Sequence, residues 1–214
     1  MPPKPKTDAE RQQLRTLIID AARELFVSRG VEAVTMREIA KRIGYSATSI
    51  YLHFADKEAL LRAICDTDFL ALASSLKKIL QITNPVERLR AIWHGYATFA
   101  LMYPNHYRLM FMAERTPCDP EASSLQQNNA EHDAYFQLKT VVNDVYEAGY
   151  FREELQNVDL IAQTLWASAH GVCSLQINMA EDKWIQWSDI SSRLQLMQEV
   201  MMRGLLRQDT REEK

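Results

Sequence analysis

Between positions 46 and 53 the sequence gathers side chains that can hydrogen-bond to a partner but carry little permanent charge. Hydroxyl, phenol and imidazole groups donate and accept hydrogen bonds, and small methyl-bearing side chains make apolar contacts. Such a set is suited to reading base edges in a DNA groove, provided that the fold presents its members on one surface. The residues concerned are Ser46, Ala47, Thr48, Tyr51 and His53.

The surrounding pattern predicts two short helices that pack at a corner. Apolar residues recur at helical spacing over residues 35–44 and again over 46–54, and Gly44 lies between the two runs. Glycine tolerates a left-handed backbone, so one helix can follow the other within a residue or two, as in a helix-turn-helix. The polar side chains then face outward near the start of the second helix, the end that enters the major groove. The apolar residues are Ile39, Ala40, Ile43, Ile50 and Phe54.

A surface hairpin of two helices in an all-α protein would fit the same pattern. The wider run, TMREIAKRIGYSATSIYLHFADKEALL, closely resembles the DNA-binding signature of the TetR family of bacterial transcription regulators. It contains a T-x-R-x-I-A motif, the glycine turn, I-Y-x-H-F and D-K-E-A-L-L. The preceding AARELFVSRGVEAVT is similar to the first helix of that family, so the resemblance covers residues 12–72.

The resemblance implies roles for individual side chains toward a double-stranded DNA operator. Thr35 would offer a hydroxyl and backbone N–H groups to a phosphate, and Arg37 would reach a phosphate or a guanine edge. Lys57 matches a phosphate-contacting lysine. Base-reading positions hold Ser46, Ala47 and Thr48, while Tyr51 and His53 match an aromatic pair that contacts the backbone or a thymine methyl group.

Three further expectations concern charge in this region. Family members often carry Lys or Arg where this chain has Ala47, so its recognition helix is expected to favour thymine methyl groups over guanine. Lys4 and Lys6 are expected to add minor-groove or phosphate contacts from the tail. Glu38, Lys41 and Arg42 are expected to form a solvated face without a DNA role.

Composition sets the protein class. The 214 residues are 47% hydrophobic and 25% charged, as in an ordinary globular protein. No run approaches the roughly 18 apolar residues of a membrane span, and the first residues lack the apolar core of a secretory signal, so a cytoplasmic protein without membrane contact is expected. Residues 1–62 hold 11 Lys and Arg against 8 Asp and Glu, although the whole chain carries a net charge of −3. The N-terminal part is therefore the one suited to a polyanion.

Scarce glycine and proline and the absence of alternating β-branched runs predict an all-α fold of about nine helices. A flexible basic tail is expected over 1–11, a DNA-binding domain over 12–72 with its helix-turn-helix at 35–54, and a ligand-binding and dimerisation domain over 84–208. The expected helices span residues 7–30, 35–44, 46–54, 56–82, 84–103, 105–114, 124–149, 159–179 and 188–207.

The C-terminal half is similar to a TetR subgroup with a Trp-x-x-x-His-Gly motif, here Trp166, His170 and Gly171. Gly171 is expected to let a neighbouring helix approach closely. Large aromatic and methionine side chains with isolated polar groups could line a cavity for one small apolar organic effector, although such stripes also form ordinary core. By analogy, the ligand would shift neighbouring helices and change the separation of two DNA heads. The candidate ligand residues are Trp93, Tyr96, Phe99, Tyr103, Tyr107, Met110, Phe111, Phe136, Trp166 and His170.

The last two expected helices carry apolar stripes suited to a two-fold four-helix interface. The expected homodimer contacts are Leu160, Leu175, Leu194, Met197, Met201 and Gly204.

Other functional classes receive weaker support. Neither a nucleophile with a base nor a carboxylate pair stands out, so no enzyme, cofactor or metal site is expected. Cys65, Cys118 and Cys173 are expected to be free thiols, and His170 with Cys173 would supply only two metal ligands. A DNA-binding regulator without a small-molecule effector, or a helical enzyme or scaffold with a degenerate head, remain the alternatives.

Overall fold

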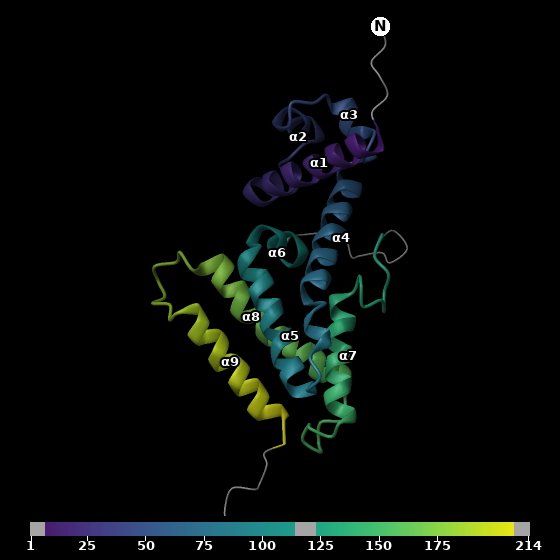
Figure 1. Ribbon diagram of the computed structural model, residues 1–214. Helices are drawn as coiled ribbons and strands as arrows, with labels where there is room; N and C mark the ends of the chain where they lie inside the picture. Colours follow the sequence, from purple (N-terminus) through teal and green to yellow (C-terminus); the bar gives the residue numbers. More distant parts are fainter. Residues whose placement is uncertain (1–6, 114–122, 208–214) are drawn as a thin grey trace, which may run out of the picture. The chain divides into compact units, whose positions relative to one another are not determined.

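The computed structural model describes residues 7–113 and 123–207, and within them the chain forms nine α-helices and a short 3-10 helix (Figure 1). The predicted all-α fold is confirmed. The chain divides into two compact units. Unit 1 comprises Met1–Phe69 and Asn105–Leu125, and unit 2 comprises Leu70–Pro104 and Gln126–Lys214.

Unit 1 begins with α1 (Asp8–Arg29), which is capped as its sequence predicts. The Thr7 hydroxyl accepts a hydrogen bond from the Glu10 backbone N–H at 3.2 Å, and the Glu10 carboxylate accepts one from the Thr7 N–H at 2.7 Å. Gly30 ends the helix with a φ of 82°. Residues 8–11, predicted to be part of a flexible tail, are instead the first turn of α1, while Lys4 and Lys6 lie outside the described residues.

The predicted helix-turn-helix is present as α2 (Met36–Arg42) and α3 (Ala47–Tyr51), joined through Gly44 with a φ of 73°. Ile39, Ala40 and Ile50 are buried together with apolar residues of α1 and α4 (Lys57–Leu76), which gives the corner a shared core. The recognition helix is shorter than predicted. Its end tightens because the backbone N–H groups of both His53 and Phe54 donate to the carbonyl of Ile50, at 2.8 and 3.0 Å.

The helix α4 leads from unit 1 into unit 2 and ends earlier than the predicted residue 82. Asp56 caps its start, where a carboxylate oxygen accepts from the Ala59 N–H at 2.6 Å. Near its other end, the buried side-chain amide of Gln137 donates to the Ala73 carbonyl at 3.0 Å. The α-helix stops at Leu76, and a 3-10 helix follows at Ile79–Gln81. The Gln137 side chain occupies the Ala73 carbonyl, which would otherwise accept a hydrogen bond within the helix.

The short helix α6 (Pro104–Phe111) contributes most of its residues to unit 1 rather than to the C-terminal domain predicted over 84–208. Leu109 is 2% exposed and belongs to the hydrophobic core of the helix-turn-helix. Phe111 meets Phe69 of α4 edge to face, with ring centroids 5.5 Å apart. The predicted domain division therefore omits a second segment of the head.

Unit 2 is built around α5 (Pro85–Met102), which contacts α7 (Ala134–Glu147), α8 (Val158–Met179) and α9 (Ile190–Leu205) (Figure 1). Gly95 is the glycine that needs its small size. A Cβ there would lie 2.7 Å from Ile79 Cδ1 and 2.8 Å from Leu76 Cδ2. Around Gly171, by contrast, no described atom lies within 4 Å of an added Cβ, so the close helix contact predicted there does not occur within the chain.

Two predicted helix starts in unit 2 are corrected. The helix predicted from residue 124 begins at Ala134, where the Asp133 carboxylate accepts from the Phe136 N–H at 2.9 Å. The last helix is capped by Asp189 rather than by Ser188, with the Ser192 N–H 3.0 Å from the carboxylate. In both cases an acidic side chain provides the cap, and Ser124 instead donates from its N–H and hydroxyl to the Asp66 carboxylate.

Candidate functional site

The predicted DNA-contacting side chains on and beside α3 differ in their exposure and in the hydrogen bonds that they already make. Ser46 is the N-cap, and its hydroxyl accepts from the Ser49 N–H at 3.2 Å and lies 2.9 Å from the Ser49 hydroxyl. Ala47 is half-buried against the core of unit 1. Thr48 is exposed and Tyr51 is 51% exposed, so these two side chains present the most open surface of the predicted set. His53 is half-buried beside Phe54.

At the start of α2, the predicted phosphate ligand Thr35 is part of a capping box that the sequence interpretation did not include. The Thr35 N–H and hydroxyl donate to the Glu38 carboxylate at 2.8 and 2.9 Å, and Arg29 donates to the same carboxylate at 2.8 Å. The bond from the Thr35 backbone, followed by those from the side chains of Arg29 and Thr35, lowers the pKa of Glu38 from 4.5 to about 2. The T-x-x-E spacing at residues 35–38 was the available signal.

The two predicted phosphate-contacting cations differ in their surroundings. Arg37 is exposed on α2. Lys57, at the first position of α4, is half-buried, and its ammonium donates to the Val31 carbonyl at 2.9 Å while lying 3.6 Å from a Glu32 carboxylate oxygen. Lys57 therefore ties the start of α4 to the loop between α1 and α2, in addition to any contact with DNA.

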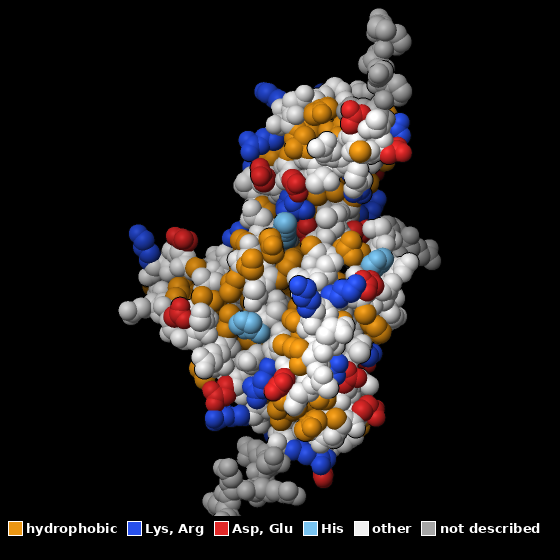
Figure 2. Space-filling view, viewed as in Figure 1, with side chains coloured by type: hydrophobic (Ala, Val, Ile, Leu, Met, Phe, Trp, Pro, Cys, Tyr) orange, Lys and Arg blue, Asp and Glu red, His pale blue; other side chains and the backbone are white. Residues whose placement is uncertain are grey.

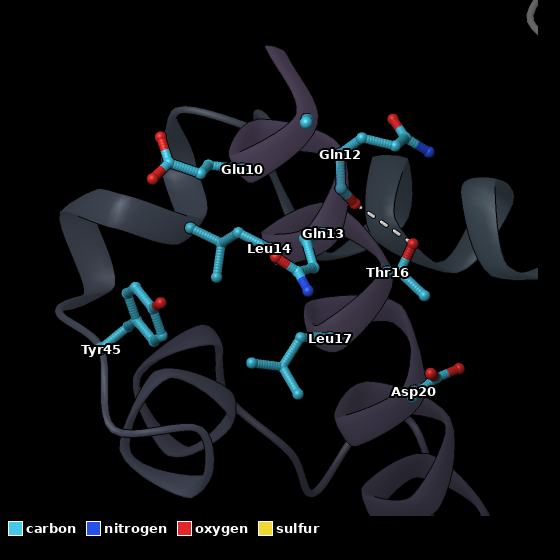
Figure 3. A pocket seen from close by; sticks show the side chains of 9 residues that line it. Glu10, Gln12, Gln13, Leu14, Thr16, Leu17, Asp20 and Tyr45 are labelled. Atoms are coloured by element: carbon cyan, nitrogen blue, oxygen red, sulfur yellow. Dashed lines mark hydrogen bonds between the residues drawn. The ribbon is translucent and has the colours of Figure 1, made fainter. Parts of the chain in front are cut away.

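Exposed apolar side chains of the head were missing from the prediction. Leu52, directly after α3, is 82% exposed beside Tyr51. Tyr45, directly before the N-cap of α3, lies over a groove along α1, where its ring faces Leu14 and Leu17 (Figure 3). Figure 3 shows the carboxylates of Glu10 and Asp20 at opposite ends of this groove, so its rim repels a phosphate backbone.

The charged side chains of unit 1 form small mixed clusters rather than one continuous basic patch. Figure 2 shows Lys and Arg side chains interspersed with Asp and Glu over the face in view. Within unit 1, several cations form ion pairs, such as Arg42 with Glu24 at 3.2 Å and Arg62 with Glu58 at 2.8 Å. The basic excess inferred for residues 1–62 is therefore available to a polyanion only where cations lack such partners.

In unit 2 the predicted ligand residues Tyr96, Trp166 and His170 form one hydrogen-bonded chain. The Trp166 indole N–H donates to the Tyr96 hydroxyl at 3.1 Å, and that hydroxyl lies 3.2 Å from Nδ1 of His170. An indole nitrogen can only donate, so the Tyr96 hydroxyl accepts from it, while the direction of its bond with His170 depends on which ring nitrogen carries the proton. Burial lowers the pKa of His170, which favours the neutral ring. Tyr135 stacks beside Trp166, with ring centroids 6.0 Å apart.

The remaining predicted ligand residues are divided between the units. Trp93 and Phe99 are buried in unit 2, where the Trp93 indole donates to the Ser168 hydroxyl at 2.9 Å. Phe136 is half-buried, and Tyr103 is exposed with its ring 5.2 Å from Phe99. Tyr107, Met110 and Phe111 lie on α6 and belong to unit 1.

The predicted dimer residues do not share one environment. Leu160 and Leu175 on α8 are 59% and 44% exposed, and Gly204 on α9 is also exposed. Met197 and Met201 are half-buried. Leu194 is only 7% exposed and packs within its own chain, so it offers little surface to a second copy. A different face of α9 exposes Leu196 and Val200.

Within the described parts of the chain, no three His, Cys, Asp or Glu side chains lie close enough to hold a metal ion. Across those same residues, no helix combines the length and apolar character needed to cross a membrane. Cys65 and Cys173 are thiols outside any disulfide, as expected; both are buried, and burial raises the pKa of the Cys173 thiol to about 12.

Comparison with known proteins links both halves of the chain to one family. Residues 18–64 match the model of "Bacterial regulatory proteins, tetR family", and residues 89–184 match "Tetracyclin repressor-like, C-terminal domain". The chain is 32% identical over 163 residues to the HTH-type transcriptional repressor KstR2 of Mycobacterium tuberculosis, covering 71% of this chain and 77% of that protein. It is 35% identical over 102 residues to the HTH-type transcriptional activator FasR of Mycolicibacterium smegmatis, which is 47% of each chain.

Solved structures agree with the fold. A TetR family transcription regulator from Marinobacter aquaeolei superposes with a TM-score of 0.73 at 17% identity, covering 94% of this chain and 100% of that one. The fatty acid degradation regulator FadR from Bacillus halodurans gives a TM-score of 0.70 at 19% identity, covering 93% and 97%. At these identities the likeness concerns the fold alone.

Proposed function

Because this chain belongs to the TetR family of bacterial DNA-binding transcriptional regulators, we propose that it is a ligand-released repressor that binds a near-palindromic operator as a homodimer. The observation that carries the DNA surface is the exposed start of α3. There, Thr48 and Tyr51 are exposed, while the inner face of the helix-turn-helix packs in the core of unit 1. A rigid scaffold with a few open polar and aromatic side chains is the arrangement that base reading requires.

The absence of a basic side chain at the reading positions defines the expected operator. Thr48, Tyr51 and the neighbouring Leu52 offer methyl, aromatic and aliphatic surface together with hydroxyl groups. These groups contact thymine methyl groups and accept or donate single hydrogen bonds, whereas guanine is read best by Arg or Lys. We therefore expect A·T-containing steps beneath the recognition helix, with Arg37 of α2 as a nearby side chain able to read guanine.

The effector part of the proposal rests on the Tyr96–Trp166–His170 chain. It places one hydroxyl group and two ring nitrogens within a largely aromatic environment built from α5, α7 and α8. An apolar ligand with one or two polar atoms could exchange hydrogen bonds with this chain while covering the open edge of Trp166. Such a ligand would rearrange α5 against α8 and so alter the segment that leads into α6.

The dimer part rests on exposed apolar surface of α8 and α9. Leu160, Leu175, Leu196 and Val200 are each between 44% and 62% exposed, which is unusual for large aliphatic side chains spaced along paired helices. Gly171 and Gly204 leave open space above their backbones, which allows helices of a second copy to approach closely. Two copies joined in this way would present two recognition helices to a two-fold operator.

Repression is favoured over activation by the likeness to KstR2, which is named a repressor and aligns over more of the chain than the activator FasR. The proposed direction is tested with a reporter gene downstream of the selected operator. A repressor lowers reporter output when the protein is present, and an activator raises it.

Selection of bound duplexes from a random pool, using the full chain, tests DNA binding and half-site spacing together. Tyr51→Ala is expected to lose specific binding, while Tyr150→Ala, which removes a phenol from unit 2 that is 44% exposed, is expected to retain it. Enrichment of a single half-site without a two-fold partner would contradict the dimer. Equal affinity of the two variants for the selected duplex would contradict the recognition surface.

A further inference from the structure

The cations of unit 1 separate into a paired majority and an unpaired minority. Of the Lys and Arg side chains that the structure describes there, only Arg37 and Lys41 lack a contact with a carboxylate, an oxygen atom of another group or an aromatic ring. The paired side chains are Arg11, Arg15, Arg23, Arg29, Arg42, Lys57, Arg62 and Arg108.

Arg37 and Lys41 also lie together. Both are exposed on α2 and are separated by four positions, so their side chains emerge from one face of the helix about one turn apart. Two like charges at this spacing repel each other, which disfavours the helix unless an anion lies between or beside them.

No acidic side chain of α2 offsets this charge. Glu38 is the acidic residue of the helix, and its carboxylate is occupied by the Thr35 N–H, the Thr35 hydroxyl and Arg29. The next cation along, Arg42, points to Glu24 of α1 instead. The face of α2 that carries Arg37 and Lys41 is therefore open to an external anion.

In contrast to the solvated face expected from the sequence, we propose that Lys41 is a further phosphate contact of the DNA-binding head and acts with Arg37 as a two-cation clamp on one DNA strand. The inference rests on the proposed recognition surface, because the first helix of a helix-turn-helix crosses the sugar-phosphate backbone when the second occupies the major groove. Arg37 lies near the start of α2, and Lys41, one turn later, meets the backbone beyond it. A lysine ammonium is a point charge on a flexible stem, so it positions the protein without reading sequence.

The test compares neighbouring charges on the same helix. Affinity of the full chain for a selected duplex and for a random duplex is measured over a series of salt concentrations. Lys41→Gln is expected to weaken binding to both duplexes alike and to reduce the slope of log affinity against log salt by about 0.9, the value for one phosphate contact. Lys41→Arg is expected to keep the wild-type slope. Arg42→Gln removes one positive charge at the adjacent position and is expected to leave the slope unchanged.

The outcomes test the two-cation clamp and the recognition surface separately. If Lys41→Gln and Arg42→Gln both keep the wild-type slope while Tyr51→Ala loses specific binding, the clamp is wrong and the recognition surface stands. A change in base preference with Lys41→Gln would also overturn a phosphate role. Absence of salt-dependent duplex binding by the wild-type chain would overturn the recognition surface itself. Thermal unfolding of each variant checks that the exposed substitutions leave the fold intact.

Discussion

Arg23 of α1 and Asp68 of α4 form a two-point ion pair inside unit 1. The guanidinium Nε and Nη2 atoms donate to the two carboxylate oxygens at 3.1 and 2.7 Å, and the residues are only 7% and 1% exposed. Asp20 accepts a further bond from Arg23 at 2.7 Å, and His106 of α6 places Nδ1 3.8 Å from the Asp68 carboxylate. Burial raises the pKa of Asp68, and Arg23 opposes that rise. The pair therefore joins α1 and α4 at a point that α6 also reaches.

Removing one member of this pair should destabilise the head strongly. Asp68→Ala would leave the Arg23 guanidinium buried with one exposed carboxylate as its neighbour, and we expect a loss of about 3–5 kcal/mol in the free energy of unfolding. Urea titration of the full chain measures it. The matched control is Glu24→Ala, which breaks the exposed pair with Arg42 and should cost less than about 1 kcal/mol.

The double substitution Arg23→Met with Asp68→Leu separates charge burial from packing. Because both charges are removed together, it should be markedly more stable than Asp68→Ala alone. A double variant as unstable as the single one would show that shape, not charge, holds the helices together.

Glu38 should make the stability of unit 1 depend on pH in the acidic range. Its pKa in the folded chain, about 2, lies below the ordinary value of 4.5, so the native state binds fewer protons than the unfolded state between these values. The stabilisation is therefore complete above about pH 4.5 and is lost as the pH falls toward 2. Melting temperatures of wild type and Glu38→Gln, recorded from pH 2 to 7, should converge at the acid end. A constant difference across this range would contradict the assignment.

Lys57 should affect both folding and DNA binding. Lys57→Ala removes the bond to the Val31 carbonyl, and we expect about 1–2 kcal/mol of destabilisation together with weaker binding to all duplexes alike. Lys57→Gln offers a neutral donor in place of the ammonium, so it should recover more stability than affinity. Denaturant titration and salt-dependent binding measure the two effects. Altered sequence selectivity would contradict the phosphate role.

Two glycines in helices should respond oppositely to alanine. Gly95→Ala places a Cβ against Ile79 and Leu76, and overpacking should cost about 1–3 kcal/mol, partly offset by the better helix propensity of alanine. Gly171→Ala meets open space within the chain, so the isolated chain should keep or slightly gain stability. Sedimentation should then reveal whether Gly171→Ala weakens the proposed dimer.

The sequence by itself determined the all-α class, the position of the helix-turn-helix and most helix starts near the N-terminus. These features depend on local interactions: Thr7 and Thr35 cap within one turn, Gly30 and Gly44 take the left-handed backbone, and apolar residues repeat at helical spacing. The family motif added DNA-contacting roles for Thr35 and Ser46, whose hydroxyls are also engaged in the caps of α2 and α3.

Only the tertiary structure decided the features that join residues far apart in the chain. The Arg23–Asp68 pair spans 45 residues, and the Gln137 amide reaches 64 residues back to Ala73, near the end of α4. Packing also assigned α6 to the head and turned Leu194 inward while Leu160 stayed exposed. A helical period gives the spacing of apolar residues, but not which of two apolar faces meets the chain's own core and which is left for a partner.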